Sequence, residues 1–89
     1  TIQLKENVTY LNAQALLDGL LGHLTRGVNT VRLDVARVEF IDSAGVGMLL
    51  KAAKAFNGAG GELTLLSPTV GLQRILKIVK LDRVLRIES

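Results

Sequence analysis

The residues best placed to do chemistry lie in the segment FIDSAGVGMLL, at positions 40–50, where a strand pattern changes into a helix pattern. Asp42 and Ser43 occupy the junction, and Gly45 and Gly47 follow. In α/β sheets, sites gather outside the carboxyl ends of the strands, where this junction lies. The Ser43 hydroxyl could act as a nucleophile or accept a phosphoryl group. An interpretation without chemistry stays open beside these: Asp42 or Ser43 is a helix N-cap, and the glycines serve a tight turn.

Serine catalysis finds no support in the rest of the chain. A serine nucleophile needs a base within hydrogen-bond reach, and the only histidine, His23, fits an ordinary position beside a leucine-rich helix face. The G-x-S-x-G elbow, the phosphate-binding loop and the dinucleotide-binding glycine pattern are all absent. No histidine or carboxylate cluster has metal-ligand spacing, and there is no cysteine. We therefore predict a protein that is not an enzyme and that has no cofactor or metal site.

The elements around this junction are predicted to alternate between strands and helices. Apolar residues at period two predict strands at residues 1–5, 31–35 with a continuation at 38–41, 62–66 and 84–87. Apolar residues at helical spacing predict helices at residues 13–24, at 44–56, and from Ser67–Pro68 to about Lys80.

Local signals mark the predicted helix ends. Asn12 is a plausible N-cap and Gly27 a plausible stop for the first helix, while Ser67–Pro68 has the form of a helix start. The order predicts a single α/β domain, residues 1–89, with a mixed or mostly parallel sheet of about four strands covered by three to four helices.

Composition narrows the class of protein further. Of the 89 residues, 48% are hydrophobic and only 3% aromatic, which predicts an aliphatic core. The net charge is +3, but a nucleic-acid site would need stacking aromatics beside its cations, and two Phe and one Tyr do not supply them, so we expect no nucleic-acid partner. No apolar run is long enough to span a bilayer, and no signal-peptide layout is visible. We expect a soluble, cytoplasmic domain.

The segment VRLDVARVEFIDSAGVGMLLKAAKAFNGAGGELTLL resembles the signature half of a STAS domain, the domain shared by sulfate transporters and bacterial anti-sigma factor antagonists. The likeness rests on a strand ending in Asp, an apolar-Asp-Ser-small-Gly turn into a helix, then Gly-Gly and another apolar strand. The tail TVGLQRILKIVKLDRVLRI is similar to the last helix and closing strand of that family.

This resemblance implies a regulatory protein–protein interaction module that acts in the control of transcription. In such antagonists the serine of the Asp-Ser turn is phosphorylated by a partner that is both anti-sigma factor and serine kinase, and the modified form releases that partner. Ser43 matches the phosphoacceptor, and Asp42 matches the acid before it. The implied partner-binding patch comprises Asp42, Ser43, Ala44, Gly45, Val46, Gly47 and Lys51.

Two other roles remain open under the same resemblance. Antagonists usually carry a Gly-Glu-Leu-Asp-like turn, for which ENVT stands at residues 6–9, and NVTYLNAQAL is similar to the STAS domains of sulfate-type anion transporters. A transporter domain would have membrane spans upstream, and its basic last helix, with Arg74, Lys77 and Lys80, could face anionic lipid. The third role is the STAS subunit of a lipid-transporting ABC complex, in which Ser43 would be only a cap.

Overall fold

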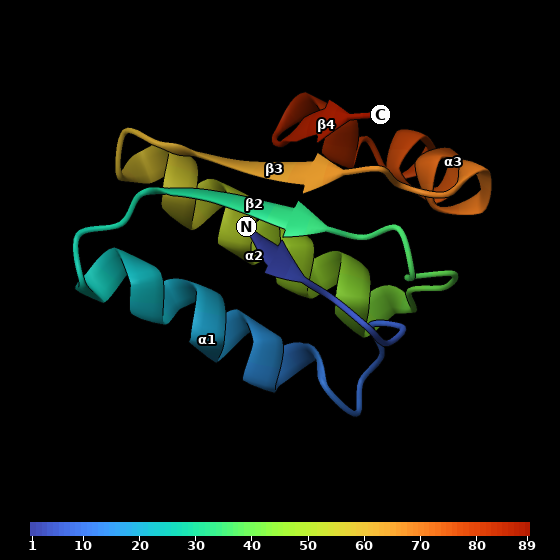
Figure 1. The fold of residues 1–89 in the computed structure, drawn as a ribbon, viewed down its shortest axis with the longest axis horizontal. Coiled ribbons are helices and arrows are strands. Elements are labelled where there is room, and N and C mark those ends of the chain that lie inside the picture. Colours follow the sequence, from blue (N-terminus) through green and yellow to red (C-terminus); the bar gives the residue numbers. More distant parts are fainter.

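A computed structural model describes all residues of the chain, Thr1–Ser89. The strands are β1 (Ile2–Gln3), β2 (Thr30–Asp34), β3 (Glu62–Leu66) and β4 (Arg86–Glu88), and the helices are α1 (Ala13–Thr25), α2 (Ser43–Gly58) and α3 (Val70–Ile78). A short 3-10 helix, η1 (Leu81–Arg83), precedes β4. The strands form one sheet in the order β1-β2-β3-β4, and every pair is parallel (Figure 1). The predicted α/β fold is confirmed.

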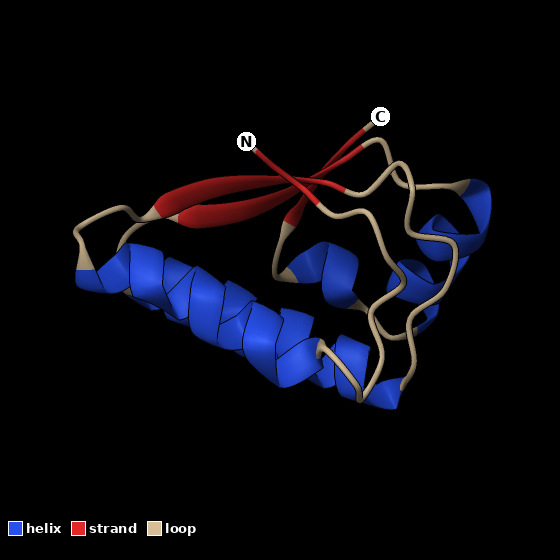
Figure 2. Cartoon of the chain, turned by 60° about the horizontal axis from the view of Figure 1, so that its bottom comes forward, coloured by secondary structure: helices blue, strands red, loops and turns tan.

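Helices α1 and α2 cover one face of the sheet, and no helix covers the other (Figure 2). Each crossover moves to the next strand in the same direction, and crossovers of one hand then leave their helices on one side. The strands match this arrangement, because Val31 and Leu33 of β2 are buried while Thr30 and Arg32 are exposed. On the open face the Arg32 guanidinium pairs with the Glu88 carboxylate at 2.7 Å.

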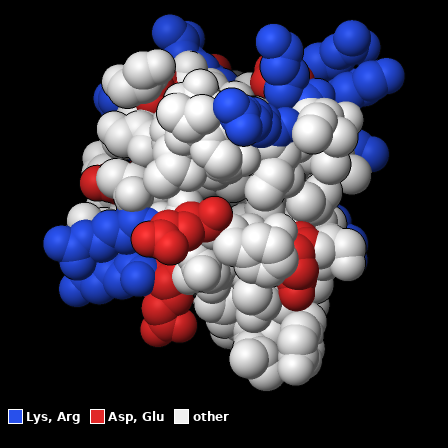
Figure 3. All heavy atoms as spheres, turned by 90° about the vertical axis from the view of Figure 1, so that its right-hand side faces the viewer, with Lys and Arg blue, Asp and Glu red and all other residues white.

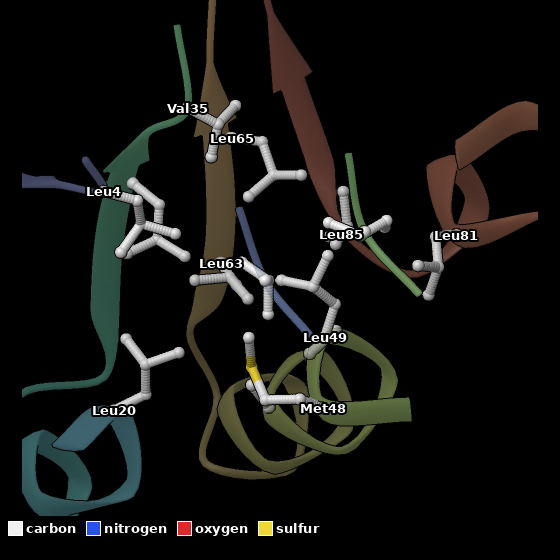
Figure 4. Packing of buried hydrophobic residues seen from close by; sticks show 14 of the residues in the cluster. Leu4, Leu20, Val35, Met48, Leu49, Leu63, Leu65, Leu81 and Leu85 are labelled. Atoms are coloured by element: carbon white, nitrogen blue, oxygen red, sulfur yellow. The ribbon is translucent and has the colours of Figure 1, made fainter. Parts of the chain in front are cut away.

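The core is a single cluster of 21 buried apolar residues. It is aliphatic apart from Phe56, as the composition predicts. Figure 4 shows Leu63 of β3 pointing toward the part of α2 that carries Met48 and Leu49. This packing fixes α2 under the centre of the sheet, so that the first turn of α2 lies at the carboxyl ends of the strands.

The predicted start of the last helix at Ser67–Pro68 is wrong. Helix α3 begins at Val70, and its N-cap is Thr69, whose Oγ1 accepts a hydrogen bond from the Leu72 N–H at 3.1 Å. Ser67 instead has a φ of 56° and donates its N–H to the Glu88 carbonyl at 2.7 Å. Its backbone therefore completes the connection to β4 and cannot enter a helix.

Two further expectations need correction. Asn12 precedes α1 as predicted but does not cap it, because its Oδ1 accepts from the Thr9 N–H and its Nδ2 donates to the Asn7 carbonyl. The predicted strand continuation at residues 38–41 is reduced to one parallel bridge between Val8 and Ile41. The segment after β1 and the segment before α2 thus lie side by side as loops.

Candidate functional site

The site is built on these two loops, residues 5–12 and 35–42. The Val8 N–H donates to the Phe40 carbonyl, and the Asp42 N–H donates to the Val8 carbonyl, both at 3.2 Å. The Asn7 Oδ1 accepts from the backbone N–H groups of Glu39 and Phe40. These contacts hold the start of α2 against a segment more than thirty residues earlier in the chain.

Asp42 is the N-cap of α2. Its Oδ1 accepts from the Gly45 N–H and its Oδ2 accepts from the Tyr10 N–H, each at 2.9 Å. The pKa of the Asp42 carboxyl lies below its ordinary value of 3.8, chiefly because the Gly45 N–H donates to the carboxylate; the Tyr10 N–H acts in the same direction, and desolvation opposes both. One carboxylate therefore caps the helix and fastens the loop that leads into α1.

Ser43 is the first residue of α2, and it is exposed. Its hydroxyl makes no hydrogen bond within the protein. Of the two residues predicted as possible N-caps of this helix, the cap is therefore Asp42. His23 lies in the last turn of α1, where the Arg26 guanidinium contacts its Nδ1 at 3.1 Å. Since α1 starts beside Tyr10 and Asp42 and runs away from them, His23 lies about 15 Å of helix beyond its start. The only histidine of the chain is therefore far from Ser43.

The two glycines after Ser43 have different roles. A Cβ on Gly45 would lie 2.6 Å from the Val8 carbonyl oxygen and 3.2 Å from the Ile41 Cβ, whereas a Cβ on Gly47 would meet nothing within 4 Å. Gly45 is buried and lets α2 approach the first loop, so it offers a partner no surface of its own. Gly47 borders open space.

A groove runs between α1 and α2 beside Ser43, with a volume of about 310 Å³. Its lining residues are Tyr10, Ala13, Gln14 and Leu17 on one side and Ala44, Gly47, Met48 and Lys51 on the other. The structure thus brings Ala44, Gly47 and Lys51 of the predicted patch onto one surface. The Val46 side chain is half-buried and packs against the core.

Three large apolar residues beside this surface were not predicted as part of it. Tyr10, Leu11 and Phe40 are 75%, 80% and 50% exposed. Phe40 falls in the strand predicted at residues 38–41, but this segment is a loop in which Val38 and Ile41 are buried and Phe40 is exposed. The end view in Figure 3 shows an uncharged region in the lower middle of this end of the molecule, with Asp or Glu side chains on both sides of it. We refer to Ser43, Ala44, Gly47, Lys51, Tyr10, Leu11 and Phe40 as the Ser43 face.

No group of three or more histidine, cysteine, aspartate or glutamate side chains is placed to hold a metal ion. None of the helices combines the length and apolarity needed to cross a bilayer.

The hydrogen bonds that the Asp42 carboxylate accepts predict that the domain loses stability when this carboxylate is protonated at acid pH. A carboxyl with a pKa lower in the folded than in the unfolded chain contributes fully above its ordinary value, 3.8, and loses that contribution as pH falls through the lowered value. Asp42→Asn should retain an acceptor for Gly45 but lose the charge and the bond to Tyr10. We expect its Tm to be lower than that of the wild type by on the order of 5 °C at neutral pH.

The difference in Tm should shrink as the pH is lowered below 3.8. Thermal unfolding followed by circular dichroism between neutral and acid pH measures it. Ser43→Ala is the matched control and should keep the wild-type Tm, because its hydroxyl has no partner. A deficit in Asp42→Asn that stays constant into strong acid would contradict this role of the carboxylate.

Comparison with known proteins places the chain in a family. A family model described as "Mlab, STAS domain" matches residues 1–87. A Thermotoga neapolitana protein named as a candidate anti-sigma factor antagonist is 36% identical over 64 residues, which are 72% of this chain and 57% of that protein. The chain thus aligns with little more than half of that curated relative's length.

Solved structures agree in fold. The crystal structure of a candidate anti-sigma factor antagonist from Thermotoga maritima superposes with a TM-score of 0.89 at 28% identity, covering 98% of this chain and 77% of that one. The anti-sigma factor antagonist SpoIIAA, in its unphosphorylated form, gives a TM-score of 0.71 at 20% identity over 92% of this chain and 84% of that one. The fold and the family match agree on a small α/β domain. The chain belongs to the STAS domain family, as its Asp-Ser turn suggested.

Proposed function

We propose that this chain acts as an anti-sigma factor antagonist, and that its Ser43 face binds an anti-sigma factor that is also a serine kinase. The observation that carries the proposal is the state of the Ser43 hydroxyl. Ser43 is exposed, its hydroxyl makes no internal hydrogen bond, and Asp42 rather than Ser43 caps the helix. The relatives named as candidate antagonists support the same class of partner. In this role the chain works in the cytoplasm, where sigma factors act.

The surroundings of Ser43 suit a protein partner. Tyr10, Leu11 and Phe40 expose apolar surface around it, and aromatic anchors of this kind contribute strongly to protein interfaces. The groove next to Ala44 and Gly47 can admit a partner side chain. Lys51 stands at this groove and would favour an acidic group on the partner.

Phosphorylation of Ser43 would act locally. It adds close to two negative charges at neutral pH, directly beside the Asp42 carboxylate. The Lys51 ammonium cannot neutralise the group within the chain, because eight residues of helix place the two positions about 12 Å apart. The phosphate would remain exposed without rearranging the fold, and it would lie at the centre of the docking surface. The partner would then dissociate.

The intact mass of the chain isolated from its native cell, followed by mapping of any phosphate, tests this proposal. We expect a fraction of molecules to carry one phosphate, located on Ser43 and absent from a Ser43→Ala strain. The exposed hydroxyl of Ser67 is a useful internal control and should stay unmodified.

Two results would count against the proposal. An unphosphorylated Ser43 under all growth conditions would favour a constitutive subunit, such as the STAS component of a lipid-transporting ABC complex. A much longer polypeptide with membrane spans would favour the domain of a sulfate-type anion transporter.

A further inference from the structure

The positive charge of the chain is concentrated in its last segment. The net charge is +3; residues 1–69 carry six cations and six carboxylates, whereas residues 70–89 carry five cations and two carboxylates. The excess therefore comes entirely from α3, η1, β4 and their connections. In the end view of Figure 3, Lys and Arg side chains project along the upper edge, the side on which α3 lies in Figure 1.

Helix α3 presents a mixed apolar and cationic face to solvent. Leu72 and Leu76 are buried on its inner side. The residues at the spacing i, i+4, i+7 and i+8 on its outer side are Val70, Arg74, Lys77 and Ile78. Val70 and Ile78 are 67% and 78% exposed, one at each end of the helix. Lys80 is exposed just beyond the end of the helix, and we call Val70, Arg74, Lys77, Ile78 and Lys80 the α3 face.

The cations of the α3 face have no partners within the protein. The only ion pairs join Glu88 to Arg32 and to Arg86, and neither arginine belongs to this face. A shallow hollow of about 370 Å³ opens beside Arg74 and Lys77, and Asp82 is the one carboxylate that lines it. Unpaired cations around exposed apolar residues indicate a surface completed by an anionic partner.

We propose that the α3 face binds the headgroup region of an anionic membrane. Cations clustered on an amphipathic helix are typical of binding to acidic phospholipids. The α3 face has only a shallow hollow, with apolar residues at both ends and cations between them. A fluid surface of phosphate groups fits such a convex face without needing the shape complementarity that an acidic protein would have to supply. This inference is independent of the role of Ser43.

Cosedimentation with lipid vesicles tests the assignment. We expect the 89-residue chain to bind vesicles containing phosphatidylglycerol but not vesicles of pure phosphatidylcholine. The double variant Arg74→Gln/Lys77→Gln should bind roughly 30-fold more weakly, from the usual contribution of each cation near an anionic surface. Raising the ionic strength from about 0.1 M to about 1 M should release the wild type, since the screening length falls from about 10 to about 3 Å.

Matched variants distinguish a specific effect of the α3 face from the effect of lowering the net charge of the chain. Arg26→Gln/Lys54→Gln removes two charges from exposed positions, one just after α1 and one on α2, and should bind as the wild type does. Ile78→Ser keeps every cation and should weaken binding by a smaller factor. Ser43→Asp should bind vesicles as the wild type does, because Ser43 lies outside the α3 face. Loss of vesicle binding in the α3 variants and loss of partner binding in the Ser43 variants can therefore be told apart. An absence of binding to phosphatidylglycerol vesicles, or equal loss in the two charge variants, would overturn the assignment.

Discussion

Replacing Gly45 by alanine is expected to destabilise the domain by about 1–3 kcal/mol, although the same change is usually favourable within a helix. The new Cβ would lie 2.6 Å from the Val8 carbonyl oxygen. That oxygen cannot move freely, because it also accepts the Asp42 N–H. Relief of the clash would therefore pull α2 away from the first loop and weaken the bond between Asp42 and Tyr10.

Gly47→Ala is the matched comparison, on the same helix and two residues away. It meets no neighbour and should stabilise the domain by about 0.5–1 kcal/mol, because alanine loses less backbone entropy on folding than glycine. Urea unfolding of the two variants measures both changes. Equal stabilities for the two variants would show that α2 does not pack against the first loop as described.

Phosphorylation of Ser43 is expected to weaken binding of the proposed anti-sigma factor partner by roughly 30-fold or more, the loss expected for a charge left unpaired in an interface. Two features make the loss large. The phosphate would lie beside the fixed Asp42 carboxylate, so the charges repel. In the proposed complex the partner would also cover Ser43 and the exposed apolar residues Tyr10 and Phe40, and desolvation of a dianion there is costly.

Unphosphorylated variants distinguish charge from the loss of the hydroxyl. Ser43→Ala should bind the partner about as well as the wild type, because the free hydroxyl makes no internal bond. Ser43→Asp should weaken binding less than phosphate does, since it brings one charge rather than nearly two. Equal affinities of Ser43→Ala and Ser43→Asp would indicate that charge at this position does not control the complex.

Much of the fold could be predicted from local patterns. The alternation in TVRLD and ELTLL and the apolar spacing of α1 and α2 depend on neighbours a few residues apart, and these elements formed as predicted. The start of α3 was missed because Ser67–Pro68 and Thr69 offer competing caps. Thr69 is the cap because Ser67 takes part in a distant contact, in which its N–H donates to the Glu88 carbonyl.

The site shows the same division. The Asp-Ser turn and its place at the start of a helix could be identified from sequence. The second bond of Asp42, to the Tyr10 N–H, joins residues 32 positions apart and has no local signal. The exposure of Phe40 was hidden because the residue continues an apolar run that looks like a strand. Its loop conformation follows from Asn7, whose side chain accepts the Glu39 and Phe40 N–H groups.

If Ser43 is a switch for a protein partner, phosphorylation must change the affinity, and isothermal titration calorimetry measures that change directly. The anti-sigma factors encoded in the same genome would be titrated with the unmodified chain and with the chain phosphorylated stoichiometrically at Ser43. We expect tight binding of one such protein by the unmodified chain, and a loss of affinity of roughly 30-fold or more on phosphorylation. Circular dichroism should show the same fold for both forms. Equal affinities for the two forms would contradict the account and would leave Ser43 as an ordinary first residue of α2.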